Sequence, residues 1–134
     1  MAPKVLLVDD DRLIHRLYQP HVERAGYQML SAFDGAEAFA TAARELPQVI
    51  VMDIMMPKSD GLSAMRELKA NEKTKDIPVI IMTVNPHFQL SQMESQLAGA
   101  ALFLTKPFGP ASLVAALQRV VSACGEMPHG AAQP

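Results

Sequence analysis

Short apolar runs alternate along the chain with longer segments of helical periodicity. The five runs are residues 4–8, 27–32, 48–52, 78–82 and 101–104. The first, third and fourth runs are continuous rather than alternating, which is typical of strands buried on both faces of a parallel sheet. The pattern therefore predicts five strands.

The segments after each run place apolar residues along one face of a helix. These faces are predicted from Leu13, Ile14, Leu17 and Val22; Ala36, Phe39, Ala40 and Ala43; Leu62, Met65 and Leu68; Leu90, Met93 and Leu97; and Leu113, Val114, Leu117, Val120 and Val121. Pro20 falls inside the first helix, so we expect a kink near residues 16–20.

Strand and helix alternate five times, which predicts an α/β fold. We expect a doubly wound five-stranded parallel sheet in the order 2-1-3-4-5 with five helices, a flavodoxin-like three-layer sandwich. The 134 residues allow one domain. We assign residues 1–124 to it and expect residues 125–134, rich in Gly, Pro and Ala, to form a disordered tail.

Composition narrows the classes of function. Twelve basic and fourteen acidic residues give a net charge of −2, which disfavours direct binding of nucleic acid. The single cysteine excludes an internal disulfide, and no segment has the length of a membrane span, so we expect a cytoplasmic protein without membrane insertion. The four scattered histidines are interpreted as surface residues.

Polar residues stand where the predicted strands end. Asp9 and Asp10 follow the first strand, Asp53 the third, Thr83 the fourth and Lys106 the fifth. The carboxyl ends of parallel strands share one edge, so the three carboxylates are expected in one pocket, where a Mg²⁺ ion would relieve their repulsion. Lys106 would offer a point charge to a phosphoryl group, and Thr83 a hydroxyl.

Taken singly, several acidic residues and the site's other polar residues have simpler explanations. Asp11 suits a helix cap, Asp60 a turn, and Asp53 alone a cap or turn. Lys106 alone would be a solvated lysine and Thr83 an ordinary strand end. Their combination at one edge favours the functional interpretation.

Four motifs in order resemble the receiver domain of bacterial two-component response regulators, in its chemotaxis-type single-domain form. They are VLLVDDD, VIVMDIMMPKSDG, IPVIIMT and FLTKPF, and the resemblance extends from Lys4 to about Ala123.

The resemblance implies a phosphorelay protein. Asp53 would accept a phosphoryl group from a sensor histidine kinase, a phosphotransfer protein or a small acyl phosphate. Asp10, Asp53 and the Met55 carbonyl would bind Mg²⁺, with Asp9 acting through water, and Lys106 would pair with the phosphoryl oxygens. The protein would not be an enzyme beyond its own phosphorylation and dephosphorylation.

The resemblance also implies a switch that signals to a downstream output protein. Thr83 would bond the phosphoryl group, Phe103 would swing inward, and the peptide before Pro107 would be cis. Val84 stands where many receivers have a small residue, and residues 85–86 (Asn-Pro) start the fourth helix unusually, so phosphorylation could be impaired.

Other classes of protein remain as alternatives. A flavodoxin-like cofactor binder would want a phosphate loop in place of the aspartates, and an aspartyl phosphatase would carry an acid where Met55 stands. A phosphorylation-independent pseudo-receiver, acting as an interaction module, is the main alternative. The fourth helix is nearly uncharged, so we expect a monomer or weak dimer. No output domain follows residue 124, so we expect a stand-alone receiver, with a piece of a longer chain as the alternative.

Overall fold

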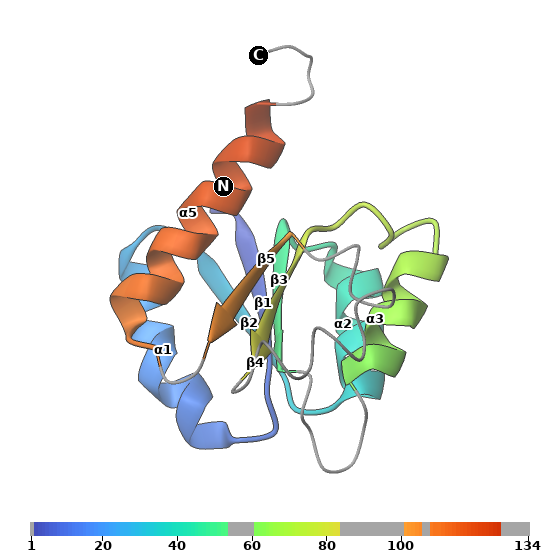
Figure 1. Cartoon of the computed structure of the whole chain (residues 1–134), viewed down its shortest axis with the longest axis horizontal. Helices are drawn as coiled ribbons and strands as arrows, with labels where there is room; N and C mark the ends of the chain where they lie inside the picture. The colour runs from blue at the N-terminus through green and yellow to red at the C-terminus, as the bar shows by residue number, and fades with distance from the viewer. Residues whose placement is uncertain (1, 54–60, 84–100, 106–107, 127–134) are drawn as a thin grey trace.

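The computed structural model describes residues 2–53, 61–83, 101–105 and 108–126 (Figure 1). Its elements are β1 (Lys4–Val8), α1 (Arg12–Arg24), β2 (Gln28–Ala32), α2 (Gly35–Glu45), β3 (Val49–Asp53), α3 (Gly61–Ala70), β4 (Val79–Thr83), β5 (Leu102–Thr105) and α5 (Pro110–Glu126). All five predicted strands are confirmed. The helix predicted around residues 90–97 and the tail after residue 126 lie outside the described residues.

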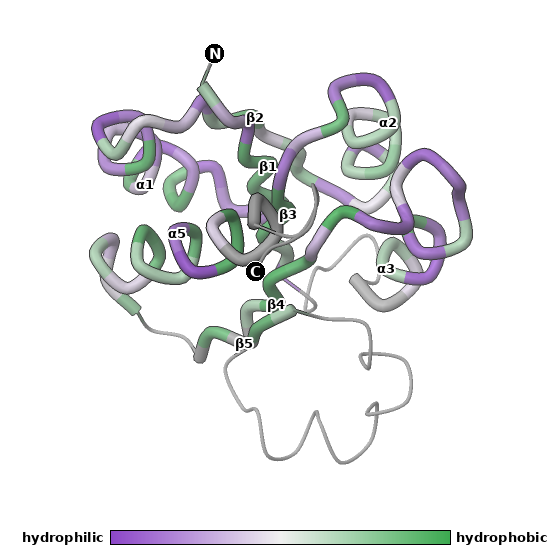
Figure 2. Tube along the Cα trace, turned by 90° about the horizontal axis from the view of Figure 1, so that it is seen from above, coloured by the Kyte–Doolittle hydropathy of each residue, from purple (hydrophilic) through white to green (hydrophobic). Residues whose placement is uncertain are grey.

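The five strands form one parallel sheet in the predicted order, β2-β1-β3-β4-β5. Helices α1 and α5 cover one face, and α2 and α3 cover the other, so the described elements make three layers (Figures 1 and 2). Strand order reverses at β1. The chain adds β2 on one side of β1 and then adds β3, β4 and β5 on the other side. No helix in the described ranges has the length and apolar character needed to cross a membrane.

Alternate side chains of the central strands enter two separate cores. Leu6, Ile50 and Ile81 face α2 and α3. Val51 and Ile80 lie in the core beneath α1 and α5. All are essentially fully buried, and burial on both faces explains why these strands appear as continuous apolar runs.

The buried face of α1 agrees with the predicted one in part. Val22 is buried and Ile14 packs against the core, as predicted. Leu13 and Leu17 are 66% and 52% exposed, while His15 and Tyr18 are buried in their place. His15 and Tyr18 can be buried because their polar atoms make hydrogen bonds, at 2.8 and 2.9 Å respectively. The helix runs through Pro20 without a break, and the expected kink stays a prediction.

Helix α2 also agrees with the predicted face in part, while α3 and α5 agree with prediction where their side chains are described. In α2 the buried residues are Gly35, Ala38, Thr41 and Ala42. Of the predicted face, Phe39 packs against the core, while Ala36 and Ala40 are exposed. Small side chains give a weak periodic signal, which explains the partial agreement. Helix α5 continues to Glu126, two residues beyond the predicted domain boundary.

Local capping bonds define where α1 begins and ends. The Asp11 carboxylate accepts from the Leu13 N–H at 3.0 Å, which confirms Asp11 as the N-cap. At the other end, Gly26 adopts φ +104°, and its N–H donates to the Glu23 carbonyl at 3.0 Å. The Tyr27 N–H donates to the Val22 carbonyl at 3.3 Å, which completes a Schellman motif.

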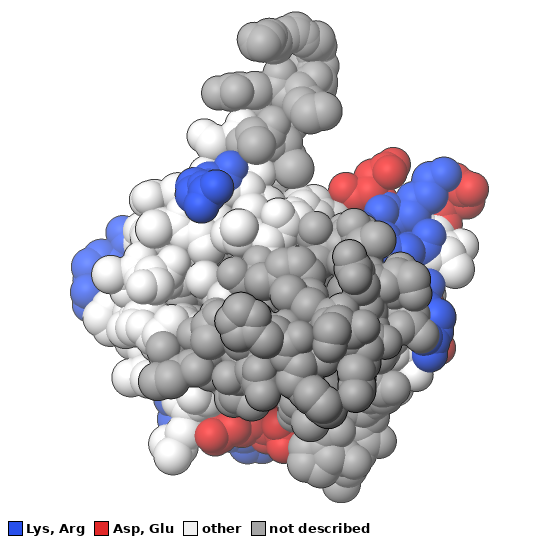
Figure 3. All heavy atoms as spheres, in the orientation of Figure 1, with Lys and Arg blue, Asp and Glu red and all other residues white. Residues whose placement is uncertain are grey.

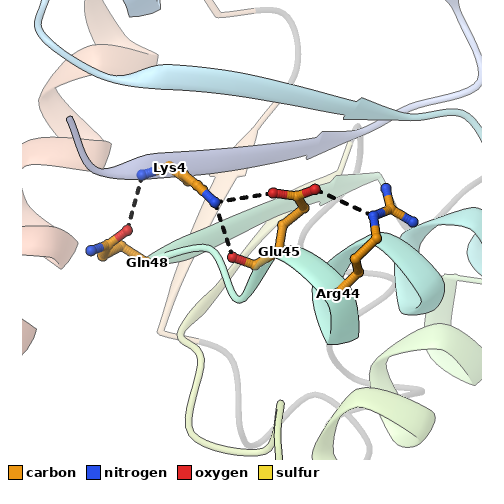
Figure 4. A network of polar contacts seen from close by, with 4 residues as sticks. All are labelled: Lys4, Arg44, Glu45 and Gln48. Carbon is orange, nitrogen blue, oxygen red and sulfur yellow. Dashed lines mark hydrogen bonds and ion pairs between the residues drawn. The ribbon is translucent and has the colours of Figure 1, made fainter. Parts of the chain in front are cut away.

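A polar network joins the end of α2 to the start of β1 (Figure 4). The Lys4 Nζ lies 3.0 Å from a Glu45 carboxylate oxygen, and the Arg44 Nε lies 3.3 Å from the other oxygen. The Lys4 N–H donates to the Gln48 side chain at 2.9 Å. The hydrogen bond from Lys4, followed by that from Arg44, lowers the pKa of Glu45 below its ordinary value of 4.5.

The exposure of Leu17 and the burial of Val22 give opposite expectations for two truncations in α1. Leu17→Ala should change the free energy of unfolding by less than about 0.5 kcal/mol, because the side chain is a surface group. Val22→Ala should lower it by about 2 kcal/mol, because it leaves a cavity in the core. Urea unfolding of both variants measures the difference, and equal losses would contradict the face assigned to α1.

The Lys4–Glu45 pair predicts a pH-dependent contribution to stability. Because folding lowers the pKa of Glu45, the contribution is present above the ordinary glutamate range and is lost as the pH falls through the lowered pKa. Lys4→Gln should therefore destabilise the fold slightly at neutral pH, and this deficit should shrink in acid. Urea unfolding across this pH range measures the deficit. Arg119→Gln, which removes the same charge elsewhere, is the control, and its effect on the free energy of unfolding should not change through the pH range in which Glu45 is protonated.

Candidate metal and phosphoryl site

Three carboxylates converge at the carboxyl ends of β1 and β3. Asp53 is the last residue of β3, and Asp9 and Asp10 follow the last residue of β1. In the register of the two strands Val8 lies opposite Met52, which brings Asp9 level with Asp53. One ligand oxygen from each carboxylate lies within 4.8 Å of the other two. The predicted acidic cluster is therefore present.

Two of the three carboxylates are buried. Asp9 is 1% exposed and Asp53 is 5% exposed, while Asp10 is exposed. The Asp9 carboxylate accepts from the Asp11 N–H at 2.9 Å, and the Asp9 N–H donates to the Ala32 carbonyl at 3.2 Å. The cluster thus consists of two buried carboxylates, Asp9 and Asp53, and one carboxylate, Asp10, that is exposed to solvent.

The chemistry of the cluster fits a hard divalent cation. Mg²⁺ prefers oxygen ligands in octahedral geometry at about 2.1 Å, so two direct ligands are at most about 4.2 Å apart. The ligand oxygens of the three carboxylates all lie within 4.8 Å of one another, which is close to this span, so the arrangement fits one shared cation. Figure 3 shows acidic side chains at the lower edge of the visible face, the end at which the strands of Figure 1 finish.

The remaining predicted site residues are described in part. Thr83 ends β4 and pairs with Thr105 of β5, so its backbone lies at the same edge as Asp53. Phe103 lies in β5 opposite Ile81. The side chains of Thr83 and Phe103 lie outside the described residues, as do all of Met55, Lys106 and Pro107, together with Val84 and residues 85–86. Their predicted roles stay predictions.

Two buried residues of α1 contact the site's loops and were missed from the sequence. The Nε2 atom of His15 lies 2.8 Å from the Asp9 carbonyl oxygen, so interpreting every histidine as a surface residue was wrong. The Tyr18 hydroxyl donates to the Phe108 carbonyl at 2.9 Å, and the two rings stack at 5.6 Å. Their three-residue spacing places both on the inner face of the helix.

Residues 5–118 match the response regulator receiver domain family. The chain belongs to this family. The receiver is 33% identical over 129 residues to the DNA-binding dual master transcriptional regulator RpaA of Synechocystis sp., covering 96% of this chain and 53% of that protein. The chain thus spans about half the length of that curated relative.

Solved receiver structures share the fold. The chemotaxis response regulator CheY4 of Vibrio cholerae superposes with a TM-score of 0.80 at 32% identity, covering 90% of this chain and 99% of that one. The receiver domain of the sensor histidine kinase PA1611 of Pseudomonas aeruginosa gives a TM-score of 0.82 at 32% identity, covering 91% and 99%. That structure holds a magnesium ion coordinated in its active site cleft.

Neighbouring aspartates provide a matched test of the acidic cluster. Mg²⁺ at about 100 times its Kd should stabilise the wild type by about 2.7 kcal/mol. Asp10→Asn should remove most of this gain, because it removes one member of the cluster. Asp11→Asn should keep the gain, because Asp11 acts as a helix cap and Asn caps equally well.

Urea unfolding with and without Mg²⁺ measures these gains. Without metal, Asp10→Asn should be more stable than the wild type, since it relieves repulsion between like charges. A Mg²⁺ gain equal to that of the wild type in Asp10→Asn would contradict the assignment of the cluster as the metal site.

Proposed function

We propose that this receiver accepts a phosphoryl group on Asp53 with Mg²⁺ bound by the acidic cluster. The proposal rests chiefly on the convergence of Asp9, Asp10 and Asp53, with Asp53 almost fully buried at the end of a central strand. A carboxylate held at a fixed strand end is a positioned nucleophile. The family match and the Mg²⁺ in the cleft of a similar receiver support the same assignment.

The reaction we propose is a single phosphoryl transfer. A carboxylate oxygen of Asp53 bonds to phosphorus while the bond to the donor's nitrogen or oxygen breaks, and the bonding pair leaves with the donor. Mg²⁺, when bound, would neutralise charge on the transferring group. Lys106 would pair with the phosphoryl oxygens, since it follows Thr105, the last residue of β5, in the sequence.

Phosphorylation would then bias a switch at β4 and β5. We assign the hydroxyl of Thr83 to the phosphoryl group and the ring of Phe103 to the inward movement. Thr83 pairs with Thr105, two residues after Phe103 along β5, so a shift at Thr83 would reach Phe103 through the paired strands. A sensor histidine kinase or a phosphotransfer protein would be the donor, and a downstream output protein would bind the phosphorylated form.

Other properties follow from this role. The protein would work in the cytoplasm as a monomer or weak dimer, would catalyse only its own phosphorylation and dephosphorylation, and would not bind nucleic acid directly. The Met55 carbonyl and a cis peptide before Pro107 would complete the site. The comparisons give the alternative of a phosphorylation-independent pseudo-receiver no support.

Intact-protein mass after incubation with acetyl phosphate tests the proposal. The wild type should gain one phosphoryl group only when Mg²⁺ is present. Asp53→Asn should gain none, because the nucleophile is lost. Asp76→Asn, the same change at an exposed position that precedes β4 and so lies toward the opposite ends of the strands from the cluster, should react like the wild type.

A second variant separates an obstructed site from an inactive one. Val84 follows Thr83 directly, and Val84→Ala should speed phosphorylation if the larger side chain limits access of small donors. Failure of both the wild type and Val84→Ala to gain mass from acetyl phosphate or from a phosphorylated histidine phosphotransfer protein would contradict the proposed function.

A further inference from the structure

His15 is a buried polar residue whose side chain contacts the backbone of Asp9, one member of the acidic cluster. Its side chain is 4% exposed. The Nε2 atom lies 2.8 Å from the carbonyl oxygen of Asp9, and the Nδ1 atom lies 2.8 Å from the hydroxyl oxygen of Ser31. The imidazole thereby joins α1 to β2 and to the first residue after β1.

The hydrogen-bond partners define the direction of the Asp9 bond. A carbonyl oxygen can only accept, so Nε2 carries a proton and donates to Asp9. In the neutral ring, Nδ1 then accepts from the Ser31 hydroxyl. The Phe33 ring packs at 4.4 Å from the imidazole with an interplanar angle of 49°, and the Arg12 guanidinium lies 4.0 Å from the Phe33 ring centre. The imidazole is therefore held on its edge and on its face.

The bond from His15 acts on the peptide unit that leads into Asp10. The Asp9 carbonyl belongs to the peptide between Asp9 and Asp10, and the Asp9 N–H is already bonded to Ala32. The backbone of Asp9 is thus fixed on both sides. Asp10 is the exposed member of the cluster, and this peptide directly precedes its Cα, so the orientation of the peptide affects the direction of its carboxylate.

We propose that His15 is a positioning residue for the metal site, which holds the Asp9–Asp10 peptide in the orientation that lets the cluster bind Mg²⁺. The inference rests on the proposed function for the identity of the metal. The hydrogen bond to the peptide, rather than the bulk of the ring, carries the effect. Outer-shell groups that orient metal ligands typically change metal affinity by about 10–100-fold when removed.

Calorimetric titration with Mg²⁺ alone tests the role of His15. His15→Leu fills similar space without a donor, and we expect it to bind Mg²⁺ roughly tenfold or more weakly than the wild type. His15→Gln places an amide N–H where Nε2 lies, and we expect it to restore most of the affinity. Ser31→Ala should have a smaller effect in the same direction, because it frees the ring without removing the donor.

A buried threonine supplies the control for general destabilisation. Thr74 donates to the Leu68 carbonyl at 2.6 Å and is fully buried between α3 and β4. Thr74→Val removes a buried bond from a side chain to a backbone carbonyl away from the cluster. It should lower stability and leave the Mg²⁺ affinity unchanged. Unchanged affinity in His15→Leu, or Gln as weak as Leu, would overturn the proposal.

Amide hydrogen exchange provides a second readout that needs no metal. The Asp11 N–H is bonded to the Asp9 carboxylate, and it should exchange faster in His15→Leu than in the wild type or Thr74→Val. If the wild type bound no Mg²⁺, the part of the proposed function that assigns Mg²⁺ to the acidic cluster would be contradicted. Exchange at Asp11 would still decide whether His15 holds the loop, and unchanged exchange in His15→Leu would overturn the positioning role.

Discussion

The parallel pairing of β1 with β3 is the constraint on which the rest of the molecule depends. Its register sets Val8 opposite Met52, so the next residues along the two strands, Asp9 and Asp53, emerge side by side at the carboxyl edge. A shift of one residue would turn one of these side chains to the other face of the sheet. Side chains of these two strands enter both cores, so the most buried part of the fold also positions the acidic cluster.

The position of the cluster at the border of the core lowers the stability of the fold, although the proposed function needs the carboxylates there. Val8 and Met52 are completely buried, and the next residue on each strand is an almost buried carboxylate. Like charges brought together at the border of an apolar core repel more strongly than they would in water, because the surroundings screen them less. The fold tolerates this because the strands on either side are fixed by burial on both faces. A cation at the site would remove a repulsion that the sheet itself imposes.

The sheet and the acidic cluster could be predicted from the sequence because both depend on strong local patterns. Continuous β-branched runs indicate buried parallel strands, and the aspartates follow those runs directly. The inner face of α1 could not be predicted in the same way. His15 and Tyr18 are buried only because they bond to Asp9, Ser31 and Phe108, and the last of these partners lies 90 residues away in the sequence. Periodicity of apolar residues correctly favoured Ile14 and Val22 but also Leu13 and Leu17, whose side chains are exposed.

The hydrogen bonds of α1 explain why this helix carries polar residues toward the core. An all-apolar inner face would offer no donor to the loops that leave the sheet. His15 bonds the loop after β1, and Tyr18, one helical turn later, bonds the segment that follows β5. The first segment leads to Asp10 of the acidic cluster, and the second follows β5, the last strand in the order of the sheet. By bonding both, α1 links the two sides of the edge at which the acidic cluster lies, so its inner face contributes to the geometry of the site as well as to the core.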